Sequence, residues 1–222
     1  DEGDQRHFSV NITPIYHDDR TVIGGSLSSR EITQELKREQ QIRSVVKRSA
    51  NLTGEAFFKD LTQQIADLFD IKYVYIGIIS EDGKQVKTKA LRTNGKLTKN
   101  FTYGLKGVPC GAVARNEDVR YFNNVAQQFP EDPKLQRWNA ESYLGVPITS
   151  PRTGDTLAIL VMINDRSWQD SPNTDFLFNI LSLRAGAELD RQTDERRIRK
   201  RDLQIKHITE SIPEMIYEYV IY

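Results

Sequence analysis

The single cysteine, Cys110, is the first residue in this sequence that could do chemistry. A cysteine nucleophile needs a neighbouring base, which in most enzymes is a histidine. The three histidines are His7, His17 and His207, so the long middle of the chain has none. One cysteine cannot close an intrachain disulfide, and a zinc site would need ligands of other types. We therefore predict no catalytic residue and no metal site, and interpret Cys110 as a small side chain packed at the start of a helix.

Carboxylates are the next candidates, because paired acids can act as general acid and base. The adjacent pairs are Asp18-Asp19, Glu81-Asp82 and Glu131-Asp132. Each stands in a turn context, where Asp is favoured because its side chain bonds to nearby backbone. The glycine spacing of a dinucleotide or phosphate loop is also missing. These patterns do not indicate an enzyme.

The elements that position these groups follow from hydrophobic periodicity. Residues 8–16 and 21–27 alternate as two strands around a polar turn, which predicts a hairpin. The most apolar stretches, 73–79 and 157–163, have the length of buried strands. The remaining predictions are strands at 87–92, 101–103, 119–122 and 142–148, and helices at 29–52 (with Ser29 as N-cap), 55–69, 107–115 and 174–211.

The first and last of these helices carry a narrow apolar stripe among many charged residues. Such a stripe is typical of a seam between two helices rather than of a globular core. On the last helix, isoleucines recur every seven residues. We predict that both helices pair with their copies in a parallel homodimer. The predicted seam residues are Ile32, Leu36, Ile42, Ile198, Ile205 and Ile212.

Charge and hydropathy exclude two classes of partner. The chain has 222 residues with 31 basic and 31 acidic side chains, so its formal net charge is zero. A strongly basic nucleic-acid-binding protein is not indicated, and the basic run at 196–201 reads as a solvated helix face. The longest apolar run, 157–163, is far shorter than the ~18 residues of a membrane span. The chain begins without Met, and we interpret it as a segment of a longer protein.

The middle of the chain resembles a GAF domain of a subfamily common in sensor histidine kinases and diguanylate cyclases. The stretches that carry the resemblance are Tyr103 to Cys110, Gln127 to Asp132, Glu141 to Ile148 and Arg184 to Arg191. The resemblance implies an α+β fold with a GAF-like antiparallel sheet.

The two flanks resemble incomplete PAS domains. Residues 11–16 and 22–25 match the last two strands of one such domain, and residues 212–219 match the opening of another. The implied organisation is the end of a PAS domain at 1–30, a linker helix at 31–52, a GAF domain at 53–190, a linker helix at 191–211 and the start of a second PAS domain at 212–222.

The resemblance also implies a role. A segment of this kind is a cytoplasmic sensory module of a bacterial signalling protein and is not itself an enzyme. It binds a small ligand, or relays a signal through dimeric helices to a downstream output domain. The implied parent is a histidine kinase of a two-component system or an enzyme of cyclic di-GMP metabolism, although neither a kinase histidine box nor a Gly-Gly-Asp-Glu-Phe signature occurs here. The alternative is a ligand-free dimerisation spacer.

In the GAF fold a small molecule sits between the sheet and the segments that cross over it. Aromatic side chains fall in that layer, and they either line a ligand pocket or simply fill the core. Haem and bilin are not expected, because no axial histidine is present and Gly111 follows the cysteine. The pattern of cyclic-nucleotide-binding GAF domains is also absent. The candidate ligand-binding residues are Tyr75, Phe101, Tyr103, Cys110, Tyr121, Phe122, Trp138 and Tyr143.

Overall fold

The computed structural model divides the chain into two units, residues 1–51 and residues 52–222, which are described one at a time. It describes residues 5–18, 20–33, 36, 52–116, 120–168 and 172–211, without the side chains of residues 116, 120, 121, 172–176 and 211. Most of the predicted linker helix, including Ile42, lies outside the described residues. So do Ile212 and the predicted start of a second PAS domain.

The first unit contains the predicted hairpin. Strand β1 (Phe8–Tyr16) pairs antiparallel with β2 (Val22–Glu31), and Phe8 lies opposite Glu31. The prediction of Ser29 as a helix N-cap was wrong, because Ser29 pairs with Val10 inside the ladder. A serine can cap a helix or continue a strand, and here the partner strand decides. Neighbouring side chains alternate between the two faces of such a ribbon.

The second unit is built on an antiparallel sheet, as predicted. The described strands run in the order β5-β4-β3-β9-β8-β7, and β6 also pairs with β4. Helices and sheet together make this an α+β fold. The strands are β3 (Tyr73–Ile79), β4 (Gln85–Thr93), β5 (Lys96–Leu97), β6 (Thr102–Gly104), β7 (Arg120–Asn123), β8 (Ser142–Thr149) and β9 (Thr156–Asn164).

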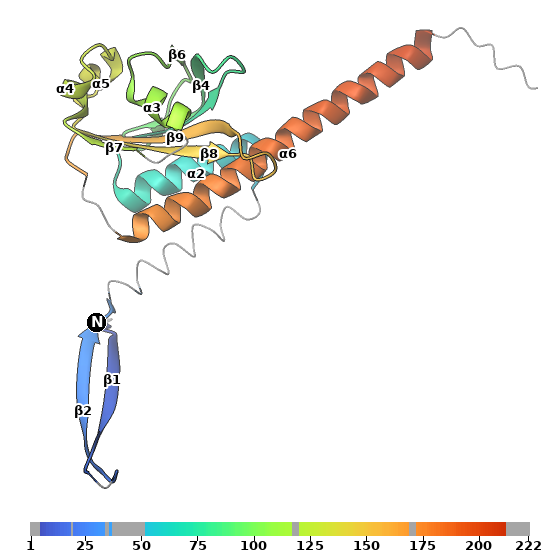
Figure 1. Cartoon of the computed structure of the whole chain (residues 1–222). Helices are drawn as coiled ribbons and strands as arrows, with labels where there is room; N and C mark the ends of the chain where they lie inside the picture. Colours follow the sequence, from blue (N-terminus) through green and yellow to red (C-terminus); the bar gives the residue numbers. More distant parts are fainter. Residues whose placement is uncertain are drawn as a thin grey trace, which may run out of the picture. The chain divides into compact units, whose positions relative to one another are not determined.

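Helices cover both faces of this sheet (Figure 1). Two long helices, α2 (Gly54–Phe69) and α6 (Pro172–Ser211), lie against one face. Three short helices lie over the other face: α3 (Pro109–Asn116), α4 (Val125–Gln128) and α5 (Pro133–Arg137). A helix of four residues such as α4 is too short to show a hydrophobic period in the sequence.

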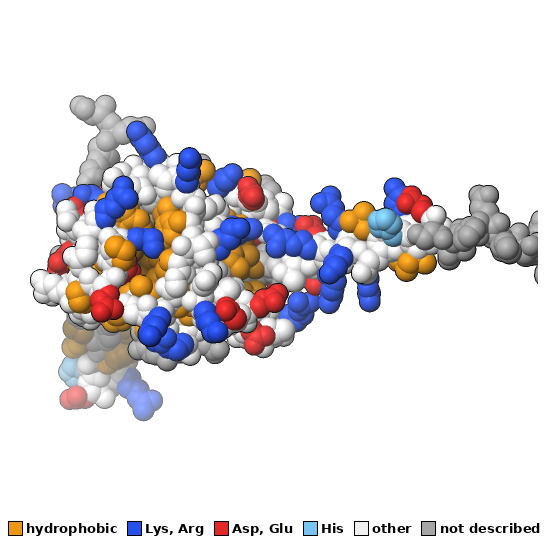
Figure 2. Space-filling view, turned by 90° about the horizontal axis from the view of Figure 1, so that it is seen from above, with side chains coloured by type: hydrophobic (Ala, Val, Ile, Leu, Met, Phe, Trp, Pro, Cys, Tyr) orange, Lys and Arg blue, Asp and Glu red, His pale blue; other side chains and the backbone are white. Residues whose placement is uncertain are grey.

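The packing of α6 depends on one glycine. A Cβ atom on Gly186 would overlap the carbonyl oxygen of Thr149, so only glycine lets the helix approach β8 this closely. The helix is 40 residues long and runs without interruption across residue 190, where the GAF domain was expected to end. Its last turns project beyond the sheet, with hydrophobic and basic side chains exposed together (Figure 2). In the described part of the chain, no helix is both long and apolar enough to cross a membrane.

Candidate functional site

Three tyrosine hydroxyls surround the thiol of Cys110 in the core between the sheet and α3. Tyr75 comes from β3, Tyr103 from β6 and Tyr143 from β8, and Cys110 lies in the first turn of α3. Their hydroxyl oxygens lie 3.2, 3.1 and 3.3 Å from the Sγ atom, respectively. Three strands and a helix therefore converge on one buried sulfur atom.

These four side chains satisfy one another. The hydroxyls of Tyr103 and Tyr143 donate to Sγ of Cys110, and the hydroxyl of Tyr75 lies 3.0 Å from that of Tyr103. Cys110, Tyr75 and Tyr143 are at most 3% exposed. A buried polar network stabilises a core only while each member has a partner. A ligand that binds among these side chains must therefore replace the hydrogen bonds that it breaks.

The electrostatics of the cluster disfavour a nucleophilic cysteine. Burial raises the pKa of the Cys110 thiol, and the hydrogen bonds from the tyrosines offset this only in part. The pKa values of the three tyrosine hydroxyls are also raised, first by burial and then by the neighbouring Cys110. Since the thiolate is the reactive form of cysteine, this thiol is suited to packing rather than to catalysis.

Further aromatic rings enclose the tyrosine–cysteine cluster. Tyr73 and Trp138 stack with ring centroids 4.5 Å apart. Phe101 lies 6.1 Å from Tyr75, and Phe122 lies 5.8 Å from Tyr143. Offset and edge-to-face contacts of this kind add to the stability gained from burial alone.

A lysine covers the edge of the cluster nearest to solvent. The Nζ atom of Lys134, on α5, lies 4.4 Å from the ring centroid of Phe101 and 4.5 Å from that of Tyr103. Both rings are partly exposed. A cation over an aromatic face is held by the quadrupole of the ring. The two rings and the lysine thus lie on the partly exposed side of an otherwise buried cluster.

The structure brings together seven of the eight predicted ligand-binding residues in one core cluster. The eighth, Tyr121, lies in β7 opposite Leu144, and the structure does not describe its side chain. Sequence analysis missed Tyr73 and Lys134. The aromatic alternation of β3 could have indicated Tyr73, whereas nothing local in the sequence marks Lys134. Ligand binding at this cluster stays a prediction.

A second polar site joins the beginning of α2 to α6. The backbone N–H of Gly54 donates to Oε1 of Glu188 at 2.6 Å, which caps a helix whose N-cap side chain makes no such bond. Arg191 donates to both oxygens of Glu188 at 2.7 Å, and Gln192 donates to Oε1 at 3.0 Å. Burial by itself would raise the pKa of Glu188, but these hydrogen bonds and the charge of Arg191 lower it to about 2.

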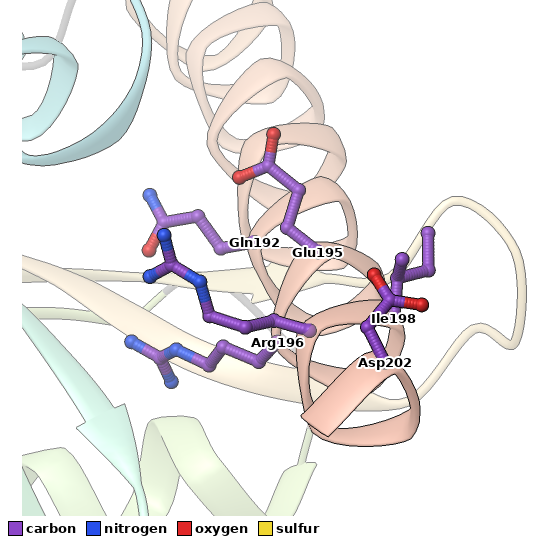
Figure 3. Close-up of a pocket in the computed structure, with 6 residues that line it drawn as sticks. Gln192, Glu195, Arg196, Ile198 and Asp202 are labelled. Carbon is purple, nitrogen blue, oxygen red and sulfur yellow. The ribbon is translucent and has the colours of Figure 1, made fainter. Parts of the chain in front are cut away.

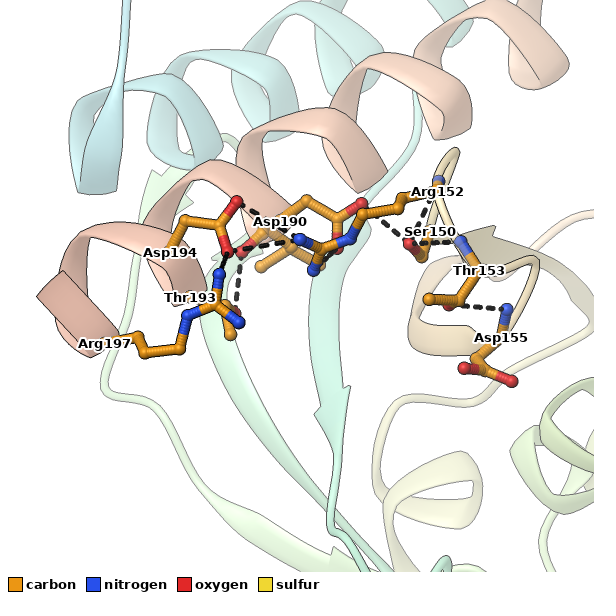
Figure 4. A network of polar contacts seen from close by, with 9 residues as sticks. Ser150, Arg152, Thr153, Asp155, Asp190, Thr193, Asp194 and Arg197 are labelled. Atoms are coloured by element: carbon orange, nitrogen blue, oxygen red, sulfur yellow. Dashed lines mark hydrogen bonds and ion pairs between the residues drawn. The ribbon is translucent and has the colours of Figure 1, made fainter.

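The same stretch of α6 is also tied to the turn between β8 and β9 (Figure 4). Ser150 donates to Asp190 at 2.7 Å, and Arg152 donates to Asp194 at 3.2 Å. Asp194 also accepts a hydrogen bond from Arg197 of its own helix. Residues 188–194 therefore connect α6 to α2 and to the sheet at the point where the helix leaves the domain.

The predicted seam residues on α6 lie beyond this junction. Ile198 and Ile205 are 58% and 61% exposed, and Ile208 is 61% exposed. Of the seam residues predicted on the first helix, Ile32 and Leu36 are partly buried. Pairing of either helix with a second copy stays a prediction.

The family model of the GAF domain matches residues 53–189. The chain belongs to the GAF family. GAF domains are generally regulatory modules of signalling proteins, and the expectation that this segment is not an enzyme is consistent with that family. No curated protein matches the chain.

Solved GAF domains share the fold at low sequence identity. The GAF domain of a phosphoenolpyruvate-protein phosphotransferase from Coxiella burnetii has a TM-score of 0.61 at 15% identity, over 72% of this chain and 96% of that one. The GAF domain of the Acinetobacter phosphotransferase has a TM-score of 0.57 at 16% identity, over 71% and 96%. A phycoerythrobilin-bound GAF domain from a cyanobacterial phytochrome has a TM-score of 0.57 at 12% identity, over 73% and 99%. These likenesses concern the fold.

Proposed function

We propose that this chain is a sensory and signal-relay segment in which the GAF domain sets the arrangement of paired helices. The observation that carries the proposal is the continuity of α6. The helix is buried against the sheet at Leu181 and Ala185, is held there by Glu188, and then projects as far as Ser211. A small movement of the domain would therefore turn or shift the projecting part as one rod.

The exposed stripe on α6 supports pairing with a second copy of the chain. Ile198 and Ile205 occupy the same position of successive heptads, so they lie on one side of the helix. In a parallel pair, Arg197 of one chain would face Asp202 of the other, which is a favourable charge contact. The equivalent positions one heptad earlier hold Asp190 and Glu195, whose charges would repel. The paired part therefore begins near Ile198.

The remaining partners of the proposal rest on the family resemblance. The exposed apolar side chains of the β1–β2 hairpin, such as Val10 and Ile12, are those of a sheet fragment that needs a larger PAS domain to cover it. The parent would be a cytoplasmic histidine kinase or an enzyme of cyclic di-GMP metabolism. Its output domain would follow the second PAS domain.

The proposal has two versions, which differ in whether the GAF domain binds a ligand. In the first, a small ligand binds at the aromatic cluster after Tyr103 and Lys134 move aside. In the second, the domain holds no ligand in this cluster and relays a signal through the paired helices. The alternative to both is a ligand-free dimerisation spacer with no sensing role of its own. The closed hydrogen bonding of Cys110 with three tyrosines favours the second version, because a ligand would have to break it.

Native mass spectrometry of the whole chain tests both points in one experiment, because it reports the number of subunits and any retained small molecule. A dimer with added mass supports the ligand sensor, and a dimer of bare mass supports the ligand-free relay or the spacer. A chain that stays monomeric at high concentration while keeping its helices would contradict the relay mechanism.

Two aspartate substitutions test whether the isoleucine stripe is the seam. Ile205→Asp should convert the dimer to a monomer, because it places charges face to face in the seam. Leu203→Asp is a matched control, because Leu203 is 57% exposed on the same helix. It lies two residues before Ile205, so its side chain points to roughly the opposite side of the helix. Light scattering would measure the mass and circular dichroism the helix content. Equal effects of the two substitutions would exclude this seam.

A further inference from the structure

A large groove lies apart from the aromatic cluster, between one end of the sheet and α6. Its volume is about 1000 Å3, at the upper end of the range of small-ligand sites. The ends of β3 and β4, the start of β9 and the turn of α6 around Gln192 form its walls. None of the eight aromatic-cluster candidates lines it.

A second hollow continues along α6. It has a volume of about 590 Å3, and Gln192 and Arg196 line both hollows. Figure 3 shows the side chains of Gln192 and Arg196 projecting to one side of the helix, while Ile198 and Asp202 project to the other. Ile198 lines the second hollow, so only the larger groove is free of the predicted seam residues.

Basic side chains gather around the larger groove. Lys87 and Lys89 reach it from β4, and Arg196 reaches it from α6. Two carboxylates also line it, Glu55 and Glu81, and Glu55 pairs with Lys59 at 3.4 Å. Within the described residues, no carboxylate forms an ion pair within 4 Å with any of the three basic side chains. The three basic side chains of the groove thus form no close ion pair with a described residue, although Glu55 and Glu188 attract the charge of Lys89 from farther away.

Lys89 lies at a β-bulge in the pairing of β3 with β4. Ile76 pairs with Ala90 and Gly77 pairs with Thr88, so Lys89 is an extra residue on β4. Lys87 and Lys89 are two residues apart and both line the groove, as the alternation of side chains along a strand places them. The Nζ atom of Lys89 lies 5.1 Å from the ring centroid of Phe58, on the helix side of the sheet. Burial, followed by the positive charge of Arg196, lowers the pKa of Lys89, and the negative charges of Glu55 and Glu188 oppose this shift only in part. The charge of a bound anion would offset the repulsion between Lys89 and Arg196.

The groove also has apolar and neutral polar surface. Ile78, Leu157 and Leu189 supply apolar side chains. The hydroxyl oxygen of Thr156 is buried and has no hydrogen-bond partner among the described groups. A buried hydroxyl without a partner is costly, and a ligand that bonds to it removes that cost. Apolar surface beside basic side chains suits a molecule with an organic body and an anionic end.

We infer that this groove binds a small organic phosphate, with its phosphate groups between Lys87, Lys89 and Arg196 and its apolar body against Ile78, Leu157 and Leu189. Such a ligand would bridge the sheet and α6 at the point where the helix leaves the domain. It would act independently of any ligand in the aromatic cluster, because the two sites share no lining residue. Opposite charge favours this occupant over a second copy of the chain, whose projecting helix is itself rich in Lys and Arg.

Calorimetric titration of the whole chain with ADP, in the absence of divalent cations, tests the inference. ADP should bind in a saturable manner, and adenosine should bind at least about tenfold more weakly, because each lost charged contact changes affinity by about that factor. Arg196→Gln and Lys89→Gln should each weaken ADP binding by about tenfold. Arg196 is exposed, so its substitution leaves the core untouched.

The matched control is Arg201→Gln, which removes the same charge from the same helix at a position that lines neither hollow. It should leave ADP binding unchanged. An equal loss in Arg201→Gln would show attraction to the whole basic helix and would overturn the site. Equal binding of adenosine, or no saturable binding at millimolar ADP, would also overturn it. The proposal would also be overturned if the NMR signals of backbone amides in the groove shifted when the chain is concentrated without ADP, because that would indicate a second copy as the occupant.

Discussion

Replacement of Glu188 by glutamine should destabilise the GAF domain more than any surface charge substitution on α6. The side chain is 8% exposed, accepts the Gly54 N–H and receives two hydrogen bonds from Arg191. Glutamine keeps the shape but loses the charge that makes these bonds strong. One of its ends would also present an NH2 group to the donors of Arg191.

The magnitude follows from the pKa. Folding lowers the pKa of Glu188 from 4.5 to about 2. At 1.36 kcal/mol per pKa unit, the charged form contributes about 3 kcal/mol to the free energy of unfolding at neutral pH. Because the folded pKa is the lower one, this contribution is complete above the unfolded pKa and is lost as pH falls toward 2. By the same relation, roughly 1.4 kcal/mol remains at about pH 3.

Urea denaturation of the two proteins, followed by circular dichroism at neutral pH and at about pH 3, gives the comparison. The difference in unfolding free energy should be about 3 kcal/mol at neutral pH and should shrink by about half at the lower pH. A suitable control is Glu210→Gln, since Glu210 forms only an exposed pair with Lys206 at 3.7 Å. That substitution should cost less than about 0.5 kcal/mol. A Glu188→Gln effect as small as the control, or one that does not change with pH, would refute the reasoning.

Two further predictions concern the core. Native Cys110 should react with iodoacetamide far more slowly than the same residue in the unfolded chain, because the thiol is buried and its pKa is raised. Tyr103→Ala removes a partly exposed side chain that contacts the thiol, so it should speed this reaction about tenfold. Labelling of the native protein at the rate of the unfolded chain would contradict the packing of Cys110. Gly186→Ala should destabilise the domain by about 2 kcal/mol in urea denaturation, despite the better helix propensity of alanine, because the new methyl group would overlap the Thr149 carbonyl. A neutral or stabilising effect would show that α6 and β8 can separate freely.

The sequence alone determined the elements whose signals are local. The Asn94-Gly95 turn is an example: both residues have positive φ angles, which these two residue types tolerate best. The antiparallel sheet, the helices α2 and α6 and the GAF family could all be inferred before the structure. So could most members of the aromatic cluster, because several separate motifs occur in the expected order.

Tertiary structure decided which of these residues meet. Gly54 and Glu188 are 134 residues apart, and no local pattern predicts their hydrogen bond. The bulge at Lys89 depends on the register of β4 against β3, and the strand pairing at Ser29 depends on a partner strand 19 residues earlier in the chain. Secondary-structure propensity and hydrophobic periodicity are properties of one segment by itself. Caps, bulges and grooves, in contrast, depend on the side chains and backbone of other segments. For that reason the charged groove and the Glu188 junction became visible only in the folded chain.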